Sequence, residues 1–311
     1  MIVVALGGNA LLRRGERLDA DVQRANVSRA ARVIGSLARR HPLVVTHGNG
    51  PQVGLLALQN AAYTETAPYP LDVLGAESEG MIGYVLEQEL GRHLPARELA
   101  TLITQVVVDP SDPAFSSPTK PVGPIYTQAE ACKLASARGW SFSTDTAGWR
   151  RVVPSPDPKA VVEIETIRIL VGHGVTVTCA GGGGVPVVPD PLGGYNGVEA
   201  VVDKDLSAAL LAIELEADAL LLLTDVTNVY EGFGTPDQRR IDRADPVTLR
   251  GLRFPAGSMG PKVEAACRFV EAGGRLAGIG AMGDAEAILA ARAGTVVVTD
   301  AGWEARRRLR R

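Results

Sequence analysis

The 311-residue sequence has few of the features that mark secreted, membrane or nucleic-acid-binding proteins. Its three cysteines are scattered without CxxC spacing, which indicates reduced core residues rather than disulfides or metal ligands. No apolar run approaches the roughly 20 residues that span a bilayer. A net charge of −3 disfavours a nucleic-acid or membrane partner. Because Met1 leads straight into an apolar strand, we expect no signal peptide and a cytoplasmic location.

Several catalytic signatures are also missing from the sequence. The four histidines show no HExxH pattern or other metal-binding spacing. There is no G-x-x-x-x-G-K-[ST] loop and no G-x-S-x-G nucleophile motif. These absences exclude a P-loop NTPase and leave no strong candidate for a covalent nucleophile.

Lysine is scarce, since only five of the 32 basic residues are lysines and the rest are arginines. Arginine is therefore the general surface cation of this chain. A lysine kept in a loop rich in Gly, Pro or Asp is a candidate for the compact, flexible ammonium of a phosphate site. Three lysines lie in such loops: Lys120, Lys204 and Lys262. For any single lysine, chance codon bias is the alternative explanation.

The chain opens with a short apolar run, Met1–Leu6, that ends abruptly at Gly7-Gly8-Asn9-Ala10. A run of this length before glycines predicts a buried strand that leads into a tight loop. Paired glycines let backbone N–H groups approach a ligand, and the following helix N-terminus favours an anion. A plain turn between strand and helix is the alternative.

Two more predicted strands end in glycine loops. Leu43–Thr46 runs into His47-Gly48-Asn49-Gly50, and Val175–Ala180 runs into Gly181–Gly184. Because ligands bind at the carboxyl ends of strands in open α/β sheets, these loops are expected to face one site. His47 is a possible base, although a loop histidine that bonds to backbone is the favoured interpretation.

The repeated alternation of strand and helix predicts an α/β fold, with a largely parallel sheet covered by helices on both faces. Glu77 and Glu79 are expected at a solvated helix start. We expect further helices in Asp19–Ala38, Tyr69–Leu94, Val161–Val171, from Gly197 and in Val263–Ala272, and further strands in Thr101–Val108, Leu220–Val226, Leu276–Ile279 and Thr295–Val298.

Residues 109–158 differ in character from the rest, because prolines are frequent and hydrophobic runs are short. Long insertions of this sort are usually functional. We therefore expect residues 112–158 to form a small lid that protrudes from the main sheet. Lys120 lies in the proline-rich loop Pro118–Pro124, and it would reach the anion site if the lid folds over the strand ends.

The glycine loops divide at about residue 195. The earlier ones group with the lid, and the later ones carry Lys204, Asp225 and Lys262. We therefore predict an N-terminal lobe of residues 1–195 that binds the phosphoryl acceptor. A C-terminal lobe of residues 196–311 would bind the nucleotide.

Glycine backbone, a few lysines and nearby aspartates are an inventory that fits phosphoryl transfer without a covalent intermediate. That reaction needs in-line positioning and neutralisation of charge on the phosphoryl oxygens. Asp203 and Asp205 flank Lys204 and are candidates to orient its ammonium or to help hold Mg²⁺. They also suit the first turn of a helix, where the macrodipole favours acidic residues, and the two roles are compatible.

Six motifs, taken in order along the chain, resemble those of the carbamate kinases in the amino acid kinase fold family. The Asn after Gly7-Gly8 and the Pro-Thr-Lys-Pro lid are distinctive, because relatives such as acetylglutamate kinase typically place a Lys after the glycines. The motifs are Val4–Ala10, His47–Gly54, Pro118–Pro121, Cys179–Gly184, Val198–Asp205 and Pro255–Lys262.

The resemblance implies an open αβα sandwich and a homodimer. It also implies reversible transfer between ATP and carbamate, giving ADP and carbamoyl phosphate, with Mg²⁺ carried mainly on the nucleotide phosphates. The expected partners are thus small molecules. The segment 189–196 looks longer than usual in such a chain, and its role stays open.

The resemblance also assigns site residues by position. The catalytic set would be Gly8, Asn9, Lys120, Asp203, Lys204 and Asp205. The carbamate and the transferring group would meet Gly7, Gly48, Asn49, Gly50, Gly181, Gly182 and Gly183. The nucleotide would meet Lys204, Thr224, Asp225, Val226, Tyr230, Gly257, Ser258, Met259 and Lys262.

Two other functions remain possible at this stage. One is a kinase of the same fold that acts on an amino acid or a nucleotide, which the absence of a Lys after Gly7-Gly8 disfavours. The other is a non-catalytic ATP-binding regulator, which the three loop lysines disfavour.

Overall fold

The centre of the protein is an eight-stranded sheet with the strand order β15-β17-β16-β12-β1-β2-β9-β3. The computed structural model describes residues 1–299 except 14, 64, 66, 146–147 and 256. All neighbouring strands in this sheet run parallel except β16 and β17. The strands are β1 (Ile2–Leu6), β2 (Leu43–His47), β3 (Leu99–Thr101), β9 (Thr176–Thr178), β12 (Ala219–Thr224), β15 (Arg243–Ala244), β16 (Leu276–Ala281) and β17 (Thr295–Val297).

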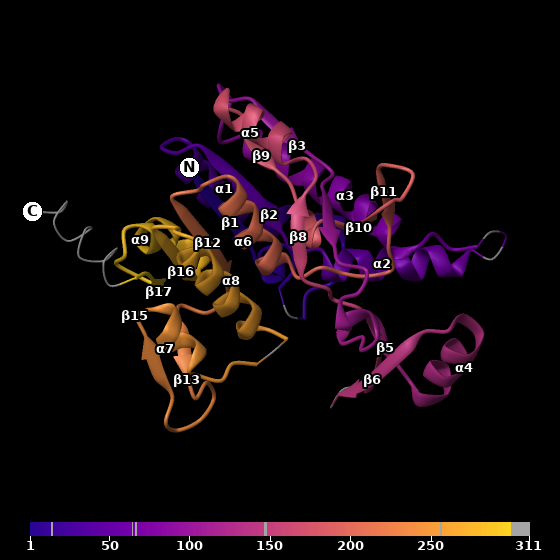
Figure 1. Ribbon diagram of the computed structural model, residues 1–311. Coiled ribbons are helices and arrows are strands. Elements are labelled where there is room, and N and C mark those ends of the chain that lie inside the picture. Colours follow the sequence, from indigo (N-terminus) through magenta and orange to yellow (C-terminus); the bar gives the residue numbers. More distant parts are fainter. Residues whose placement is uncertain (14, 64, 66, 146–147, 256, 300–311) are drawn as a thin grey trace, which may run out of the picture.

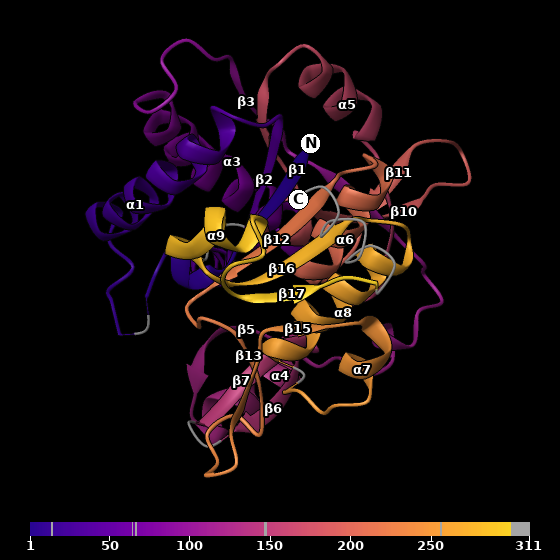
Figure 2. The ribbon, with the colours of Figure 1, turned by 90° about the vertical axis from the view of Figure 1, so that its left-hand side faces the viewer.

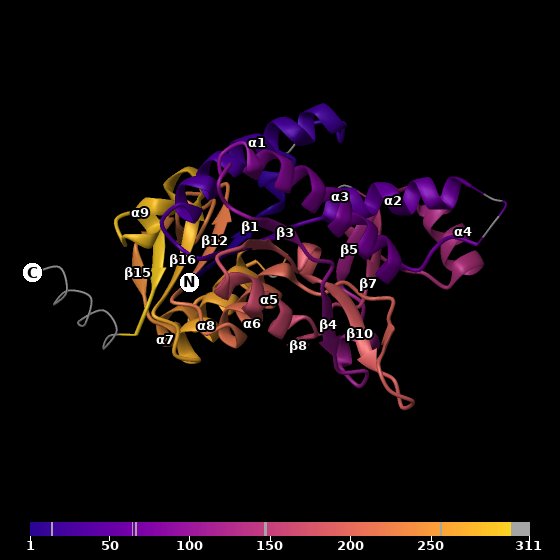
Figure 3. The same ribbon diagram turned by 90° about the horizontal axis from the view of Figure 1, so that it is seen from above.

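Helices cover both faces of this sheet, so the predicted αβα sandwich is confirmed (Figure 3). Alternate residues of β1 point to opposite faces, which is why a continuous apolar run forms this strand. One face packs against α1 (Ala20–Ala38), α3 (Leu71–Gly91) and α9 (Ala285–Leu289). The other face packs against α5 (Ile164–Gly172), α6 (Lys204–Glu214) and α8 (Met259–Glu271).

Three smaller sheets flank the sandwich. The first has the order β11-β10-β4-β8, the second β5-β7-β6, and the third pairs β13 with β14. Their strands are β4 (Gln105–Val108), β5 (Lys120–Tyr126), β6 (Ser141–Asp145), β7 (Gly148–Val153), β8 (Pro158–Val161), β10 (Val185–Pro189), β11 (Tyr195–Gly197), β13 (Val229–Glu231) and β14 (Arg239–Ile241). The remaining helices are α2 (Gly50–Ala62), α4 (Gln128–Arg138), α7 (Pro246–Arg250), η1 (Gly8–Ala10), η2 (Pro113–Phe115), η3 (Gly181–Gly183) and η4 (Met282–Asp284).

The β5-β7-β6 sheet and α4 lie within the predicted lid and stand apart from the central sheet (Figure 1). Strand β5 of this small sheet contacts α2. Figures 1 and 2 both show this small sheet at the same end of the molecule as α7 and β13. The boundaries of the two lobes stay a prediction.

The single strand predicted for residues 101–108 is wrong. Strand β3 ends at Thr101, and β4 begins at Gln105 in a different sheet. Between them, the backbone N–H of Thr104 donates to the Glu79 side chain rather than to a neighbouring strand. The Thr104 carbonyl accepts from the Val185 N–H at the start of β10, so Thr104 lies where the chain passes from one sheet to the other.

The prediction of a solvated helix start at Glu79 is also wrong. Glu79 lies in the middle of α3 and its residue is only 2% exposed. Charge patterning in the sequence suggested an exposed face, but this face of α3 packs against the glycine turn after β9. Further boundaries differ from prediction. The helix expected from Gly197 begins at Lys204, because Gly197 ends β11. The helix expected from Val161 begins at Ile164, because Val161 ends β8. Helix α8 begins at Met259 rather than Val263, and Lys120 begins a strand.

Among the described helices, none is both long enough and apolar enough to cross a bilayer.

Candidate functional site

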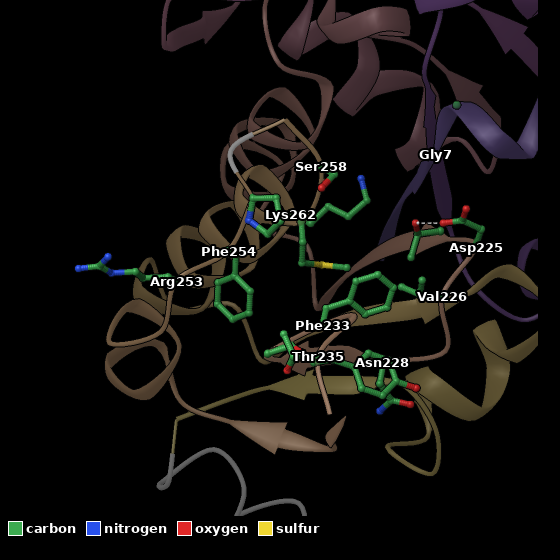
Figure 4. Close-up of a pocket in the computed structure, with 16 residues that line it drawn as sticks. Gly7, Asp225, Val226, Asn228, Phe233, Thr235, Arg253, Phe254, Ser258 and Lys262 are labelled. Carbon is green, nitrogen blue, oxygen red and sulfur yellow. Dashed lines mark hydrogen bonds between the residues drawn. The ribbon is translucent and has the colours of Figure 1, made fainter. Parts of the chain in front are cut away.

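A cavity of about 570 Å³ opens at the carboxyl ends of β1 and β12. Figure 4 shows Lys262 and Ser258 toward the end where Gly7 lies, and Thr235 and Asn228 toward the other. The residues that line it are Gly7, Gly8, Thr224, Asp225, Val226, Asn228, Tyr230, Gly232, Phe233, Thr235, Arg253, Phe254, Pro255, Ser258, Met259 and Lys262.

The middle of this cavity is apolar and partly aromatic. Tyr230 and Phe233 come from the segment after β12, with ring centroids 5.9 Å apart. Phe254 and Met259 come from the segment that leads into α8. Aromatic and apolar walls beside a few polar groups are typical of a pocket for a flat organic ligand.

A buried carboxylate joins two lysines next to the cavity. Asp205 Oδ1 accepts from Lys204 Nζ at 2.5 Å, and its Oδ2 accepts from Lys262 Nζ at 2.8 Å. Both ammonium groups and the carboxylate are largely buried, with side chains no more than 12% exposed. The sequence placed the two lysines 58 positions apart, and α6 and α8 bring them together.

The pKa values of these groups follow from burial and pairing. Burial alone would raise the pKa of Asp205, but the two ammonium groups hold it at about 2. Burial lowers the pKa of Lys204, and its pairing with Asp205 opposes that shift. Burial also opposes charge on Lys262, but pairing with Asp205 raises the Lys262 pKa overall. The cluster is thus a fixed, dehydrated source of positive charge.

Asp203 holds the N-terminus of α6 and also binds the lid. Its Oδ1 accepts from the Asp205 backbone N–H at 2.9 Å, which caps the helix. Its Oδ2 accepts from Lys120 Nζ at 2.7 Å. The side chain of Lys120 is one-third exposed, unlike the two buried lysines. One aspartate therefore connects the first residue of β5 to the helix that carries Lys204.

The first two glycine loops meet beside Lys204. A Cβ atom at Gly48 would lie 3.3 Å from the Gly8 backbone and 3.6 Å from Lys204 Cδ. Only glycine keeps this spacing without displacing a neighbour. The loops after β1 and β2 therefore converge on the lysine cluster, as their parallel strands predicted.

The third glycine loop packs against the second. Gly182 has a φ of +68°, and a side chain there would overlap the amide of Asn49. The Gly183 carbonyl accepts from Ser207 Oγ on α6 at 2.7 Å. Asn49 Nδ2 in turn donates to Ser78 Oγ on α3 at 2.8 Å. The turn after β9 is thus fixed between α3 and α6.

His47 is fully buried and bonded to backbone, as the favoured interpretation held. Its Nδ1 lies 3.1 Å from the Gly48 carbonyl, so this nitrogen donates. Burial lowers the pKa of His47 to about 4, so the ring is neutral.

The structure brings together most of the residues that the sequence nominated. Nine of them line the cavity directly: Gly7, Gly8, Thr224, Asp225, Val226, Tyr230, Ser258, Met259 and Lys262. Gly257 is not among the lining residues, and a side chain at Gly50 would meet nothing within 4 Å. The prediction for Asn9 concerns a side chain that lies outside the described part of the structure. The roles of all these residues stay predictions.

Sequence reasoning missed several residues of the cavity wall. Phe233 lies in a Gly-Phe-Gly segment, and Phe254 directly precedes the glycine loop that was singled out. For Phe233, an isolated aromatic residue between two glycines is the sequence feature that could have indicated a cavity wall, because the residue does not belong to a helix or strand that would bury its ring. Arg253 and Thr235 carry no comparable signal.

The chain is similar to known proteins of one family over nearly its whole length. The model of the amino acid kinase family matches residues 1–279. The chain is 54% identical to a carbamate kinase of Rhizobium meliloti over 299 residues, covering 95% of this chain and 92% of that protein. It is 52% identical to a carbamate kinase of Haemophilus influenzae over 295 residues, covering 94% and 95%.

Solved structures of similar proteins share the fold of this chain. The carbamate kinase from Giardia lamblia bound to AMP-PNP superposes with a TM-score of 0.90 at 41% identity, covering 96% of this chain and 98% of that one. A protein from Aeropyrum pernix K1 gives a TM-score of 0.89 at 44% identity, covering 96% and 99%.

The buried cluster predicts a strong stability effect for Asp205→Asn. The substitution leaves two ammonium groups buried together, so the free energy of unfolding at pH 7 should fall by about 3–5 kcal/mol. Urea unfolding followed by circular dichroism measures it. Because the folded pKa of about 2 lies below the ordinary 3.8, the stabilisation is present above pH 3.8 and lost as pH falls through 2.

The matched control for that experiment is Asp218→Asn. Asp218 pairs with the N-terminal ammonium and Arg275, but its side chain is half exposed. Removing the Asp218 charge should change the free energy of unfolding by less than about 1 kcal/mol. Equal effects of the two substitutions would contradict the account of the cluster.

Proposed function

Because the chain belongs to the amino acid kinase family and matches its carbamate kinases over nearly its whole length, we propose that it transfers a phosphoryl group reversibly between ATP and carbamate. Transfer from ATP to carbamate gives ADP and carbamoyl phosphate. One observation supports this most directly: the aromatic cavity ends at Gly7 and Gly8, where three lysines and two aspartates gather.

The cavity is proposed as the nucleotide site. Its apolar middle, formed by Tyr230, Phe233, Phe254 and Met259, suits the adenine ring. Lys262 and Ser258 stand toward the glycine end, where the phosphates would lie (Figure 4). A nucleotide in this orientation would point its terminal phosphate at the glycine loops.

The glycine loops are proposed to bind the transferring group and the carbamate. The backbones of Gly8 and Gly48 meet beside the Lys204 side chain. The Gly48 N–H donates to the Leu6 carbonyl, so Gly8 and the Lys204 ammonium would be the donors to the transferring group here. Phosphoryl transfer needs such donors, because negative charge spreads over the phosphoryl oxygens in the transition state. The reaction needs no covalent intermediate with the protein. Asn49 and the Gly181–Gly183 turn would complete the acceptor side.

Lys120 is proposed to supply the positive charge that the first glycine loop lacks, since residue 9 is Asn. Its ammonium is held by Asp203, 2.7 Å away. A phosphoryl group with about two negative charges would compete with that single carboxylate for Lys120. The lid would then close on the phosphoryl group while Lys204 stays with Asp205.

Mg²⁺ is proposed to bind mainly to the nucleotide phosphates. Among the described residues, no group of three or more His, Cys, Asp or Glu side chains is placed to hold a metal. Mg²⁺ sites of kinases commonly use only one or two carboxylates besides phosphate oxygens and waters. Asp225 lines the cavity and is a carboxylate of that kind. When bound, the ion would neutralise phosphate charge.

A homodimer in the cytoplasm is also part of the proposal. Three exposed apolar side chains of α3, those of Val73, Met81 and Tyr84, recur at spacings of eight and three residues. Such spacing places them on one helical face, which a second copy of the chain would cover.

The activity is tested by a coupled assay that detects ATP formed from ADP and carbamoyl phosphate. We expect turnover that depends on Mg²⁺ and on both substrates. An amino acid or nucleotide kinase of the same fold would instead turn over only with its own acceptor. A non-catalytic ATP-binding regulator would bind AMP-PNP in calorimetry and form no ATP.

Lys204→Ala should lower kcat by roughly 10²–10³, because it removes a donor that acts on charge formed in the transition state. The same coupled assay at saturating substrate measures this. The control is Lys159→Ala, which removes an exposed lysine paired with Asp157. Near-normal turnover of the Lys204 variant would exclude its proposed role.

Lys120→Ala should lower kcat while leaving the KM for ADP within about threefold, because Lys120 would act on the phosphoryl group and not on the nucleoside. The control is Lys133→Ala, an exposed lysine on α4 in the same lid. If only the KM for the nucleotide changed, the proposed lid role would be wrong.

A further inference from the structure

Glu79 is a buried carboxyl group that pairs with no cation among the described residues. Its Oε2 accepts from the Thr104 backbone N–H at 2.9 Å, and its Oε1 has no hydrogen-bond partner among the described residues. Glu89 on the same helix is equally buried, but it accepts from Arg24 and Arg92. Two glutamates of α3 therefore face the interior, and only one of them is paired with positive charge.

The bond from Glu79 to Thr104 continues to the third glycine loop. Thr104 Oγ1 accepts from the Ala180 backbone N–H at 2.9 Å and donates to the Leu102 carbonyl at 3.0 Å. Ala180 has a φ of +49°, which is rare for a residue with a side chain and needs support from its surroundings. Glu79 thus supports, through one residue, the strained start of the Gly181–Gly183 turn.

The same stretch of α3 also supports the second glycine loop. Ser78, next to Glu79, accepts from Asn49 Nδ2 at 2.8 Å and donates to the Gly75 carbonyl at 2.7 Å. Gly181 of the third loop lies between the His47 and Glu79 side chains, since a Cβ there would be 2.6 Å from His47 Nε2 and 3.0 Å from Glu79 Cγ. Glu79 therefore stands directly behind the proposed acceptor site.

The groups that face Glu79 offer no positive charge. His47 on β2 is neutral, because burial lowers its pKa to about 4. Burial raises the pKa of the Cys179 thiol, and Glu163 before α5 adds only negative charge. Burial raises the pKa of Glu79 well above its ordinary value, although the Thr104 N–H opposes the shift.

We propose that Glu79 is a positioning residue, carried as a neutral carboxylic acid, that fixes the Gly181–Gly183 turn and the Asn49 loop against each other. Its role in turnover rests on the proposed function, whereas its protonation state does not. The chain of contacts runs from Glu79 through Thr104 to Ala180, and no step of it needs a charged carboxylate.

The protonation state fixes the sign of a pH effect on stability. A carboxyl group with a raised folded pKa contributes stability that is present below its unfolded pKa and lost as pH rises through the folded value. Glu79→Gln keeps an acceptor for Thr104 and removes this loss. The melting temperature of this variant, relative to the parent, should therefore increase from pH 5 to pH 8.

The test compares Glu79→Gln and Glu79→Ala with a control, Glu89→Gln. At pH 7 the Glu79→Gln variant should keep kcat within about threefold of the parent, while the Glu79→Ala variant should lose about tenfold or more with little change in KM for ADP. The control breaks ion pairs with Arg24 and Arg92, so its relative melting temperature should not increase with pH.

Three results would overturn the proposal. They are a parent-like kcat for Glu79→Ala, an equal loss of kcat in both variants, and a melting difference for Glu79→Gln that does not change with pH. If Glu79→Ala does not fold, the kcat of Glu79→Gln and the pH dependence of its melting temperature still test the proposal. If the parent forms no ATP from ADP and carbamoyl phosphate, the proposed function fails, and the melting series alone decides on Glu79.

Discussion

The carboxylate of Asp205 is the constraint on which the rest of the site depends. Two ammonium groups cannot be buried side by side unless a negative charge lies between them. Asp205 provides it from the first turn of α6, while Lys262 arrives from α8. The relative position of these two helices is thereby tied to charge balance as well as to apolar packing, and both helices share one core cluster.

The sheet brings the neutral half of the site to this charged cluster. Strands β1 and β2 are parallel neighbours in register, so Leu6 pairs with His47 and their glycine loops leave the sheet at the same level. β12 adjoins β1 on its other side and leads into the cavity wall at Thr224. The glycine loops and the lysine side chains thus converge although they come from distant parts of the chain.

Features that depend on local sequence pattern could be predicted from the sequence. Strands that end in glycines were predicted, because apolar runs mark them directly, and the scarcity of lysine singled out Lys120, Lys204 and Lys262. The loops expected around these lysines were wrong, since Lys120 begins β5, Lys204 begins α6 and Lys262 lies in α8. The burial of Glu79 could not be predicted, since it depends on which face of α3 meets the turn after β9. The strand break before Gln105 lies at the same contact, where Glu79 accepts from the Thr104 N–H, and local pattern does not reveal it either.

The three lysines differ in how firmly they are held, and this bears on how the site works. Lys204 and Lys262 are buried and share one carboxylate, so moving either would leave charge uncompensated in the interior. Lys120, on a strand outside the central sheet, is one-third exposed and its ammonium is bound by Asp203. A partly exposed ion pair contributes less to stability than a buried one, so Lys120 is more readily exchanged to another partner. We therefore expect the fixed pair to set the position of the phosphates, and the lid lysine to respond to their arrival.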